Sequence, residues 1–133
     1  MKLARITQWS ALFAVTLAGH ATDSVQRAAT PIVVQNYYSA LPGKAEEVFE
    51  LRQHASEVRA KLGLRRGRVL RRISAPKSEA DAGPDVIWEC DYPSQAAREK
   101  DVARLSQSAE FDQVEKQMDT LLRKFDRAVF TSK

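Results

Sequence analysis

The hydrophobic and polar positions after residue 30 predict six elements in the order strand, helix, strand, strand, helix, strand. Residues 32–41 (IVVQNYYSAL) are rich in β-branched and aromatic types and lie between two prolines, which is typical of a strand. In residues 45–62 the apolar positions recur at steps of three and four, which indicates an amphipathic helix. Gly63 follows it, the residue type expected at a left-handed helix end.

Two more strands and a second helical region follow. Residues 68–74 and 85–92 read as strands, and residues 74–85 between them read as a loop with two prolines and a glycine. Ser94 is a candidate N-cap for the second helical region. Its first part, residues 95–105, is weakly amphipathic, and the polar residues 106–108 indicate a kink or restart.

The strongest periodicity lies in the second part of this helical region. Its apolar residues form a stripe that falls within an arc of roughly 100° on a helical wheel, which predicts a helix with one face against the core. Residues 127–131 then read as a short last strand. The stripe comprises Phe111, Val114, Met118, Leu121, Leu122 and Phe125.

The element order β-α-β-β-α-β predicts an α+β, ferredoxin-like domain. A four-stranded antiparallel sheet would carry its helices on one face and leave the other face bare. A bare face that is half apolar is costly to leave in water, so we expect a homodimer that buries it. The residues expected on this open face are Val33, Gln35, Tyr37, Ser39, Ile87, Glu89 and Asp91.

The first 21 residues have the three-part pattern of a signal peptide. Lys2 and Arg5 precede a short apolar run, and small residues flank a cleavage site after Ala21. The run is too short to span a bilayer, so no stable membrane insertion is expected after cleavage. We expect a secreted, periplasmic protein with a leader at residues 22–30 and one domain at 31–133; the alternative is an amphipathic N-terminal helix of a cytosolic protein.

Composition and charge exclude several classes of function. The chain has 133 residues, of which 44% are hydrophobic and 29% charged, as in ordinary globular domains. Signal cleavage would lower the 21 basic residues to 19 against 17 acidic residues, so the net charge falls from +4 to +2 and gives little support for nucleic-acid binding. One cysteine and two histidines predict no disulfide within the chain, no metal site and no cofactor.

Three segments carry a resemblance to a known superfamily: residues 33–38 (VVQNYY) with the exit 42–44 (PGK), residues 88–94 (WECDYPS) and residues 105–111 (LSQSAEF). Over residues 31–131 the chain resembles the dimeric α/β-barrel superfamily, which includes NIPSNAP-like and antibiotic-biosynthesis-monooxygenase-like proteins. The resemblance implies a dimeric α/β barrel. It does not fix an activity, because the superfamily includes cofactor-free oxygenases, haem-degrading enzymes, isomerases and proteins without known activity.

The haem-degrading branch fits poorly. The resemblance aligns Asn36 with the asparagine of that branch and Tyr92 with its aromatic residue. The iron-ligand position falls near Val102, and no histidine follows His54. Without an axial nitrogen the iron lacks a protein ligand, so haem degradation is not expected.

Five residues are candidates for a ligand pocket between sheet and helices. Asn36 would offer a hydrogen bond, or else is a buried asparagine tied to the backbone. The other four, together with Phe49, would line the pocket, or else form part of an ordinary core. The five are Asn36, Tyr38, Trp88, Tyr92 and Met118.

His54 and Asn36 are the candidate catalytic residues. His54 flanks the first helix's stripe and would act as a general base, or else is a surface histidine. Glu89 and Asp91 share one face and would do acid–base work, or else pair with arginines of the second strand or across a dimer. Cys90 has no basic neighbour in sequence and is interpreted as buried and unreactive.

The basic cluster of residues 65–72 would receive an anionic ligand or a membrane headgroup, or else has a structural explanation. The second strand lies at the sheet edge in this topology, and charged side chains protect edges against aggregation. Its arginines alternate between faces and lack an aromatic platform for nucleic acid. The cluster comprises Arg65, Arg66, Arg68, Arg71 and Arg72.

The sequence therefore predicts a homodimer that binds a small apolar or aromatic molecule. The first alternative is a cofactor-free monooxygenase or isomerase that acts on an aromatic or quinone-like molecule through Asn36 and His54. The second is a structural or stress-associated dimer without a pocket. Whether the protein is an enzyme stays open at this point, and the arrangement of Asn36 and His54 separates the alternatives.

Overall fold

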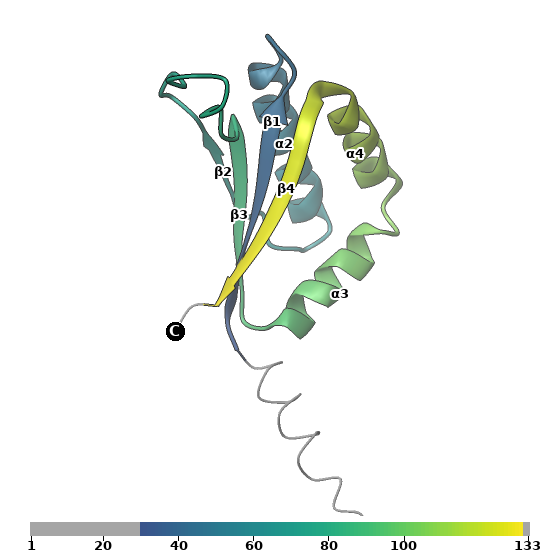
Figure 1. The fold of residues 1–133 in the computed structure, drawn as a ribbon. Coiled ribbons are helices and arrows are strands. Elements are labelled where there is room, and N and C mark those ends of the chain that lie inside the picture. The colour runs from purple at the N-terminus through teal and green to yellow at the C-terminus, as the bar shows by residue number, and fades with distance from the viewer. Residues whose placement is uncertain (1–29, 132–133) are drawn as a thin grey trace, which may run out of the picture.

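The computed structural model describes residues 30–131, which form one sheet and three helices (Figure 1). The element order confirms the predicted alternation, with the second helical region divided in two. The elements are β1 (Ile32–Ala40), α2 (Ala45–Lys61), β2 (Arg68–Arg71), β3 (Val86–Tyr92), α3 (Gln95–Leu105), α4 (Ala109–Leu121) and β4 (Leu122–Thr131).

The predicted signal peptide at residues 1–21 lies outside the described residues, as does the predicted leader except for its last residue. Among residues 30–131, no helix combines the length and the apolar character needed to cross a membrane.

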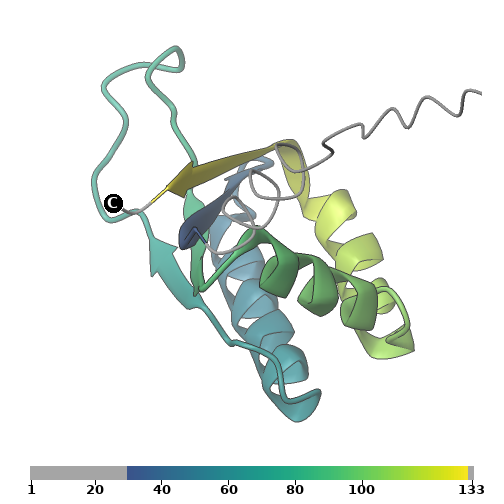
Figure 2. The ribbon, with the colours of Figure 1, turned by 90° about the horizontal axis from the view of Figure 1, so that it is seen from below.

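The sheet has the order β2-β3-β1-β4, and every neighbouring pair is antiparallel. All three helices lie on one face of it (Figure 2). The helix α2 connects β1 to the edge strand β2, and α3 with α4 connects β3 to the other edge strand, β4. This arrangement confirms the predicted α+β, ferredoxin-like fold.

The core lies between the helices and the sheet. Helix α2 contributes Val48, Ala55 and Val58, which are at most 1% exposed. Full burial of a valine side chain stabilises a fold by about 1.5–3 kcal/mol. Alternation along β1 and β3 directs Val34 and Val86 to the same core. The spacing of apolar residues is therefore enough to explain which face of each element is buried.

Three local signals in the sequence are confirmed. Gly63 has a φ of +73°, which ends α2 in the left-handed region. The Ser94 hydroxyl accepts a hydrogen bond of 3.1 Å from the Ala97 backbone N–H at the start of α3. The predicted restart at residues 106–108 separates α3 from α4, and the Ser108 hydroxyl caps α4 by accepting from the Phe111 N–H at 3.2 Å.

Three predicted boundaries are wrong by more than one residue: the end of the last helix, the start of the last strand and the end of the second strand. Helix α4 ends at Leu121, so Leu122 and Phe125 belong to β4, which is longer than the predicted strand at 127–131. Pairing with β1 decides this, because Phe125 lies opposite Tyr38 and the two ring centroids are 5.3 Å apart. The second strand ends at Arg71 and not at residue 74: Arg71 lies opposite Val86, the first residue of β3, and beyond this pair a single backbone hydrogen bond of 2.8 Å runs from the Arg72 N–H to the Asp85 carbonyl.

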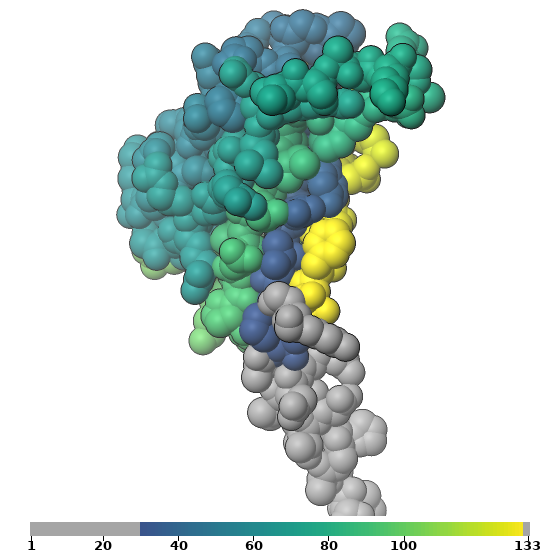
Figure 3. Space-filling model, turned by 90° about the vertical axis from the view of Figure 1, so that its left-hand side faces the viewer, coloured from purple at the N-terminus to yellow at the C-terminus, as the bar shows by residue number. Residues whose placement is uncertain are grey.

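The opposite face of the sheet carries no helix, and Figure 3 shows β3, β1 and β4 side by side at the surface. The register places Val33, Gln35 and Tyr37 on this face, next to Asp91, Glu89 and Ile87 of β3, as predicted. This open face is about half apolar. Its apolar residues are Val33, Tyr37, Leu70, Ile87, Ala128 and Phe130, and its polar residues include Gln35, Arg68, Glu89, Asp91 and Asp126.

A row of hydrogen bonds crosses the open face. The Tyr37 hydroxyl donates to the Gln35 side-chain oxygen, the Gln35 amide donates to Glu89, and Arg68 of β2 pairs with the same carboxylate. The hydrogen bond from Gln35, together with Arg68, holds the pKa of Glu89 below its usual value against the opposing effect of burial. The ion pair confirms the expectation that Glu89 is partnered by an arginine of the second strand.

Candidate functional site

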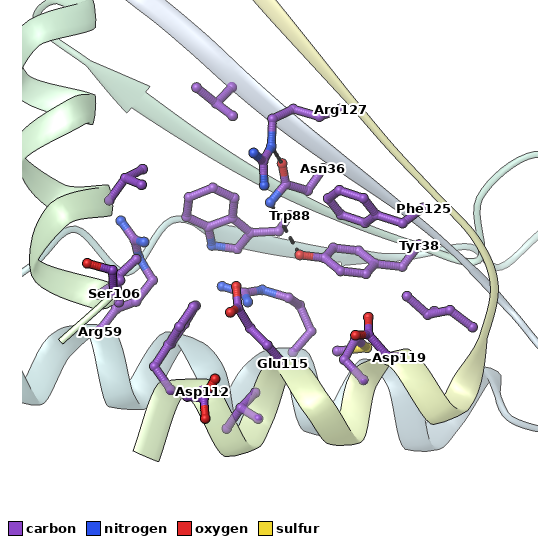
Figure 4. A pocket seen from close by; sticks show the side chains of 18 of the residues that line it. Asn36, Tyr38, Arg59, Trp88, Ser106, Asp112, Glu115, Asp119, Phe125 and Arg127 are labelled. Carbon is purple, nitrogen blue, oxygen red and sulfur yellow. Dashed lines mark hydrogen bonds between the residues drawn. The ribbon is translucent and has the colours of Figure 1, made fainter. Parts of the chain in front are cut away.

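A cavity of about 520 Å³ lies between the sheet and the helices. Strands β1, β3 and β4 form one side of it, and α2, α3 and α4 form the other (Figure 4). This volume falls in the range of about 300–1,000 Å³ that is usual for small-molecule sites. The apolar and aromatic side chains that line it are Val34, Tyr38, Trp88, Tyr92, Val102, Leu105, Phe111, Val114, Met118, Leu122 and Phe125.

The structure brings together all five residues predicted for a pocket. Asn36 and Tyr38 of β1 and Trp88 and Tyr92 of β3 point to the helix side because alternate residues of a strand share a face. Met118 reaches the cavity from α4. Phe49, named with them, packs against the core and is not part of the lining.

Asn36 is held by side chains and not by the backbone. Its Oδ1 accepts a hydrogen bond of 2.7 Å from Arg127 Nε, and its Nδ2 donates to the Tyr38 hydroxyl at 3.3 Å (Figure 4). Arg127 is the register partner of Asn36 on β4, so pairing of the strands brings the two side chains together. Sequence reasoning did not single out Arg127, because the register between β1 and β4 was not known.

Two buried arginines of α2 also line the cavity, and sequence reasoning missed both. Arg52 is 5% exposed and Arg59 is 3% exposed. They lie seven residues apart, so they share one face of the helix. A signal was present, since each follows a residue of the apolar stripe, Val48 or Ala55, by four positions.

Arg59 is the centre of a hydrogen-bonded cluster at the α3 end of the cavity. Its Nη2 donates to the Tyr92 hydroxyl at 2.8 Å and to Asp101 Oδ2 at 3.1 Å. Its Nε donates to the Arg65 carbonyl at 2.6 Å. Its guanidinium lies 4.7 Å from the centroid of the Trp88 ring, within cation–π range. Arg59 therefore connects α2 to β3, α3 and the segment before β2.

No family model matches the chain, and no curated protein sequence matches it. Solved structures do match. A NIPSNAP family protein from Agrobacterium tumefaciens is 18% identical, with a TM-score of 0.56 over 78% of this chain and 87% of that chain. A dimeric ferredoxin-like protein of unknown function from Bacteroides fragilis is 11% identical, with a TM-score of 0.56 over 77% of this chain and 96% of that chain.

An antibiotic-biosynthesis-monooxygenase-like protein from Bacteroides thetaiotaomicron is 14% identical, with a TM-score of 0.53 over 80% of this chain and 90% of that chain. The chain has a NIPSNAP-like, ferredoxin-like fold. This confirms the resemblance drawn from the sequence at the level of the fold. At these identities the similarity carries no activity to this chain.

Within this NIPSNAP-like fold, His54 lies away from the cavity. Its side chain is 51% exposed, and its Nε2 is 3.9 Å from Glu110 Oε1 on α4. It is not among the residues that line the cavity, so Asn36 and His54 do not converge. The carboxylates that line the cavity, Asp112, Glu115 and Asp119, occupy exposed positions of α4.

The remaining candidates, Cys90 and Asp91, lie outside the cavity lining. Burial raises the pKa of the Cys90 thiol, which agrees with the interpretation of an unreactive cysteine. Asp91 is exposed on the open face. Residues 30–131 contain no cluster of three or more His, Cys, Asp or Glu side chains that could hold a metal ion.

Tyr92 gives a testable signature of the buried end of the cavity. Burial raises the pKa of its hydroxyl to about 12, although Arg59 beside it acts in the opposite direction. An unfolded tyrosine has a pKa of about 10, so the contribution of Tyr92 to stability is complete below that pH and is lost as the pH rises to about 12. We expect the free energy of unfolding to fall more steeply across this window in the wild type than in Tyr92→Phe.

Absorbance at 295 nm follows the same group directly. We expect one of the three tyrosines to ionise near pH 12 and its contribution to be absent in the Tyr92→Phe variant. A full tyrosine titration near pH 10 in the folded protein would show that the Tyr92 hydroxyl is accessible to water.

Proposed function

We propose that the protein binds a small aromatic or apolar molecule in the cavity between sheet and helices. The observation that carries the proposal is the cavity itself, which is lined by Tyr38, Trp88, Tyr92 and Phe125 around the side chain of Asn36. Binding sites of this kind combine a mostly apolar lining with a few fixed polar groups. Because Asn36 is held by Arg127 and Tyr38, its position does not depend on the ligand.

Native mass spectrometry of the full chain isolated from cells tests this function. We expect a bound small molecule that is retained in the wild type and lost in Met118→Trp, which fills the cavity. Gln117→Trp adds the same side chain at the neighbouring, exposed position of α4 and should retain the molecule. Absence of any bound mass, also after incubation with a panel of charged and neutral aromatic compounds, would contradict the proposal.

We propose further that two copies pair through the open face of the sheet. A half-apolar face that no helix covers favours association. Two of its polar residues, Gln35 and Glu89, already have hydrogen-bond partners, which lowers the cost of burying them. A protein with the same fold, from Bacteroides fragilis, is described as dimeric.

The two faces of β4 offer a matched pair of variants for this interface. Phe130 lies on the open face and is 48% exposed, and its neighbour Val129 lies on the helix side and is 45% exposed. We expect Phe130→Glu to shift the protein from dimer to monomer in sedimentation equilibrium, and Val129→Glu to leave the dimer intact. A Phe130→Glu variant that stays dimeric would contradict pairing through this face.

We propose that the protein is exported to the periplasm. The support is the charged start, short apolar run and small residues of positions 1–21. We expect the protein purified from cells to begin at Thr22, as N-terminal sequencing would show. Protein that retains Lys2 and Arg5 and fractionates with the cytosol would contradict this prediction.

A further inference from the structure

Arg52 is a buried cation for which the described part of the chain supplies no counterion. Its side chain is 5% exposed and lines the cavity, and its Nε has no hydrogen-bond partner. No carboxylate of residues 30–131 forms an ion pair with it. Arginine stays protonated in proteins, and an unpaired buried charge is costly.

Arg59 shows what complete pairing of a buried arginine looks like on the same helix face. It has a carboxylate partner in Asp101, a hydroxyl partner in Tyr92 and a carbonyl partner in Arg65. Helix α2 therefore presents two buried arginines to one cavity. The fold neutralises one of them and leaves the other with its positive charge.

The neighbours of Arg52 stabilise a cation without neutralising it. Its guanidinium carbon is 5.0 Å from the centroid of the Trp88 ring, within cation–π range. Burial lowers the pKa of Arg52, and the adjacent Tyr38 acts in the opposite direction. The Trp88 ring and the Tyr38 phenol carry no charge. They therefore do not neutralise Arg52, and the side of the cavity formed by α2 keeps a positive charge.

The other charges of the cavity do not cancel that of Arg52. Asp112, Glu115 and Asp119 line it from exposed positions of α4 (Figure 4), where water and salt screen them. Asp112 is also paired with Lys116 at 2.7 Å. Arg98 and Arg127 also line the cavity, and Asp101, which pairs with Arg59, is not part of the lining.

We propose that Arg52 is an anion-binding residue and that the ligand of the cavity is an aromatic carboxylate. The inference rests on the proposed function and names the class of its ligand. A guanidinium binds a planar carboxylate through two parallel hydrogen bonds, and the aromatic lining accepts the attached ring. The ligand would supply the counterion that Arg52 lacks in the chain.

A pair of probes of the same shape tests the charge alone. The full chain is titrated by calorimetry with 2-naphthoate and with the neutral 2-naphthamide. We expect the wild type to bind the carboxylate about tenfold or more tightly than the amide, because hydrogen bonds to charged groups are the stronger ones. In Arg52→Met we expect the affinity for the carboxylate to fall about 10–100-fold and that for the amide by less than about threefold.

Two further variants serve as controls. One tests whether the shape of the guanidinium matters, and the other tests whether loss of any positive charge is enough. Arg52→Lys keeps the charge but loses the planar fork, so an intermediate loss is expected. Arg71→Met removes one charge from a cation–π contact outside the cavity, where Arg71 lies 5.0 Å from the Phe49 ring, and should bind both probes as the wild type does. Ligand-free Arg52→Met should melt at a higher temperature than the wild type, because it lacks an uncompensated buried charge.

The outcomes separate the inference from the function on which it rests. Equal affinity of the wild type for both probes would overturn the anion site and leave a cavity that binds aromatic molecules. An equal loss of 2-naphthoate binding in Arg71→Met and Arg52→Met would assign the preference to net charge and also overturn it. Binding of neither probe, together with failure of the charged and neutral aromatic panel, would contradict the proposed function and the inference with it.

Discussion

Gly67→Ala is expected to lower the free energy of unfolding by about 4 kcal/mol. Gly67 has a φ of +69°, which strains a residue with a side chain by about 1–3 kcal/mol. An added Cβ would also lie 2.3 Å from Trp88 Nε1 and 2.8 Å from the Glu89 carbonyl oxygen, and overpacking costs about 1–3 kcal/mol more. Trp88 cannot move away freely, because its Nε1 donates to the Arg66 carbonyl at 2.8 Å.

Gly63→Ala separates the two contributions. Gly63 has a similar φ of +73°, but nothing lies within 4 Å of an added Cβ. Chemical denaturation should therefore show a loss of about 1 kcal/mol at Gly63 and a much larger loss at Gly67. We also expect Gly67→Ala to weaken ligand binding, since Trp88 forms part of the cavity. Equal losses of stability would mean that the loop before β2 gives way and that Trp88 is not tightly packed.

The fold was predictable because its periodicities are strong, and the errors fall where tertiary pairing overrides them. Leu122 and Phe125 continue the helical spacing of α4, yet they pair with β1. Residues 122 and 125 suit an amphipathic helix as well as a half-exposed edge strand. Local sequence therefore cannot decide between the two, whereas nine residue pairs between β4 and β1 can.

The aromatic part of the site was predicted, and its charged part was missed although Arg52 and Arg59 lie four residues after members of the apolar stripe. Trp88 and Tyr92 follow from strand alternation alone. Arg52 and Arg59 count as polar in any helical pattern, so a search for an apolar stripe passes over them. What places them is the cation–π contact with Trp88, together with the Arg59–Asp101 pair. These contacts depend on how α2, α3 and β3 pack.

Asp101→Asn is expected to lower the free energy of unfolding by about 3 kcal/mol. The side chain of Arg59 is 4% exposed and that of Asp101 is 17% exposed, so the substitution leaves a buried charge without its counterion. Removal of one partner of a buried pair costs about 3–5 kcal/mol, and the partial exposure of Asp101 puts the effect at the lower end. Denaturation in urea at neutral pH measures it.

An exposed ion pair between α2 and the segment before β2 provides the control. Glu57 pairs with Arg66, and both side chains are more than half exposed, so Glu57→Gln should cost less than about 1 kcal/mol. The double variant Arg59→Met, Asp101→Asn removes both charges and should be more stable than Asp101→Asn alone, although Tyr92 then loses a hydrogen bond. If Asp101→Asn cost no more than Glu57→Gln, the charge of Arg59 would not need Asp101. The absence of a counterion at Arg52 would then no longer point to a missing anion, so this stability measurement also bears on the proposed ligand.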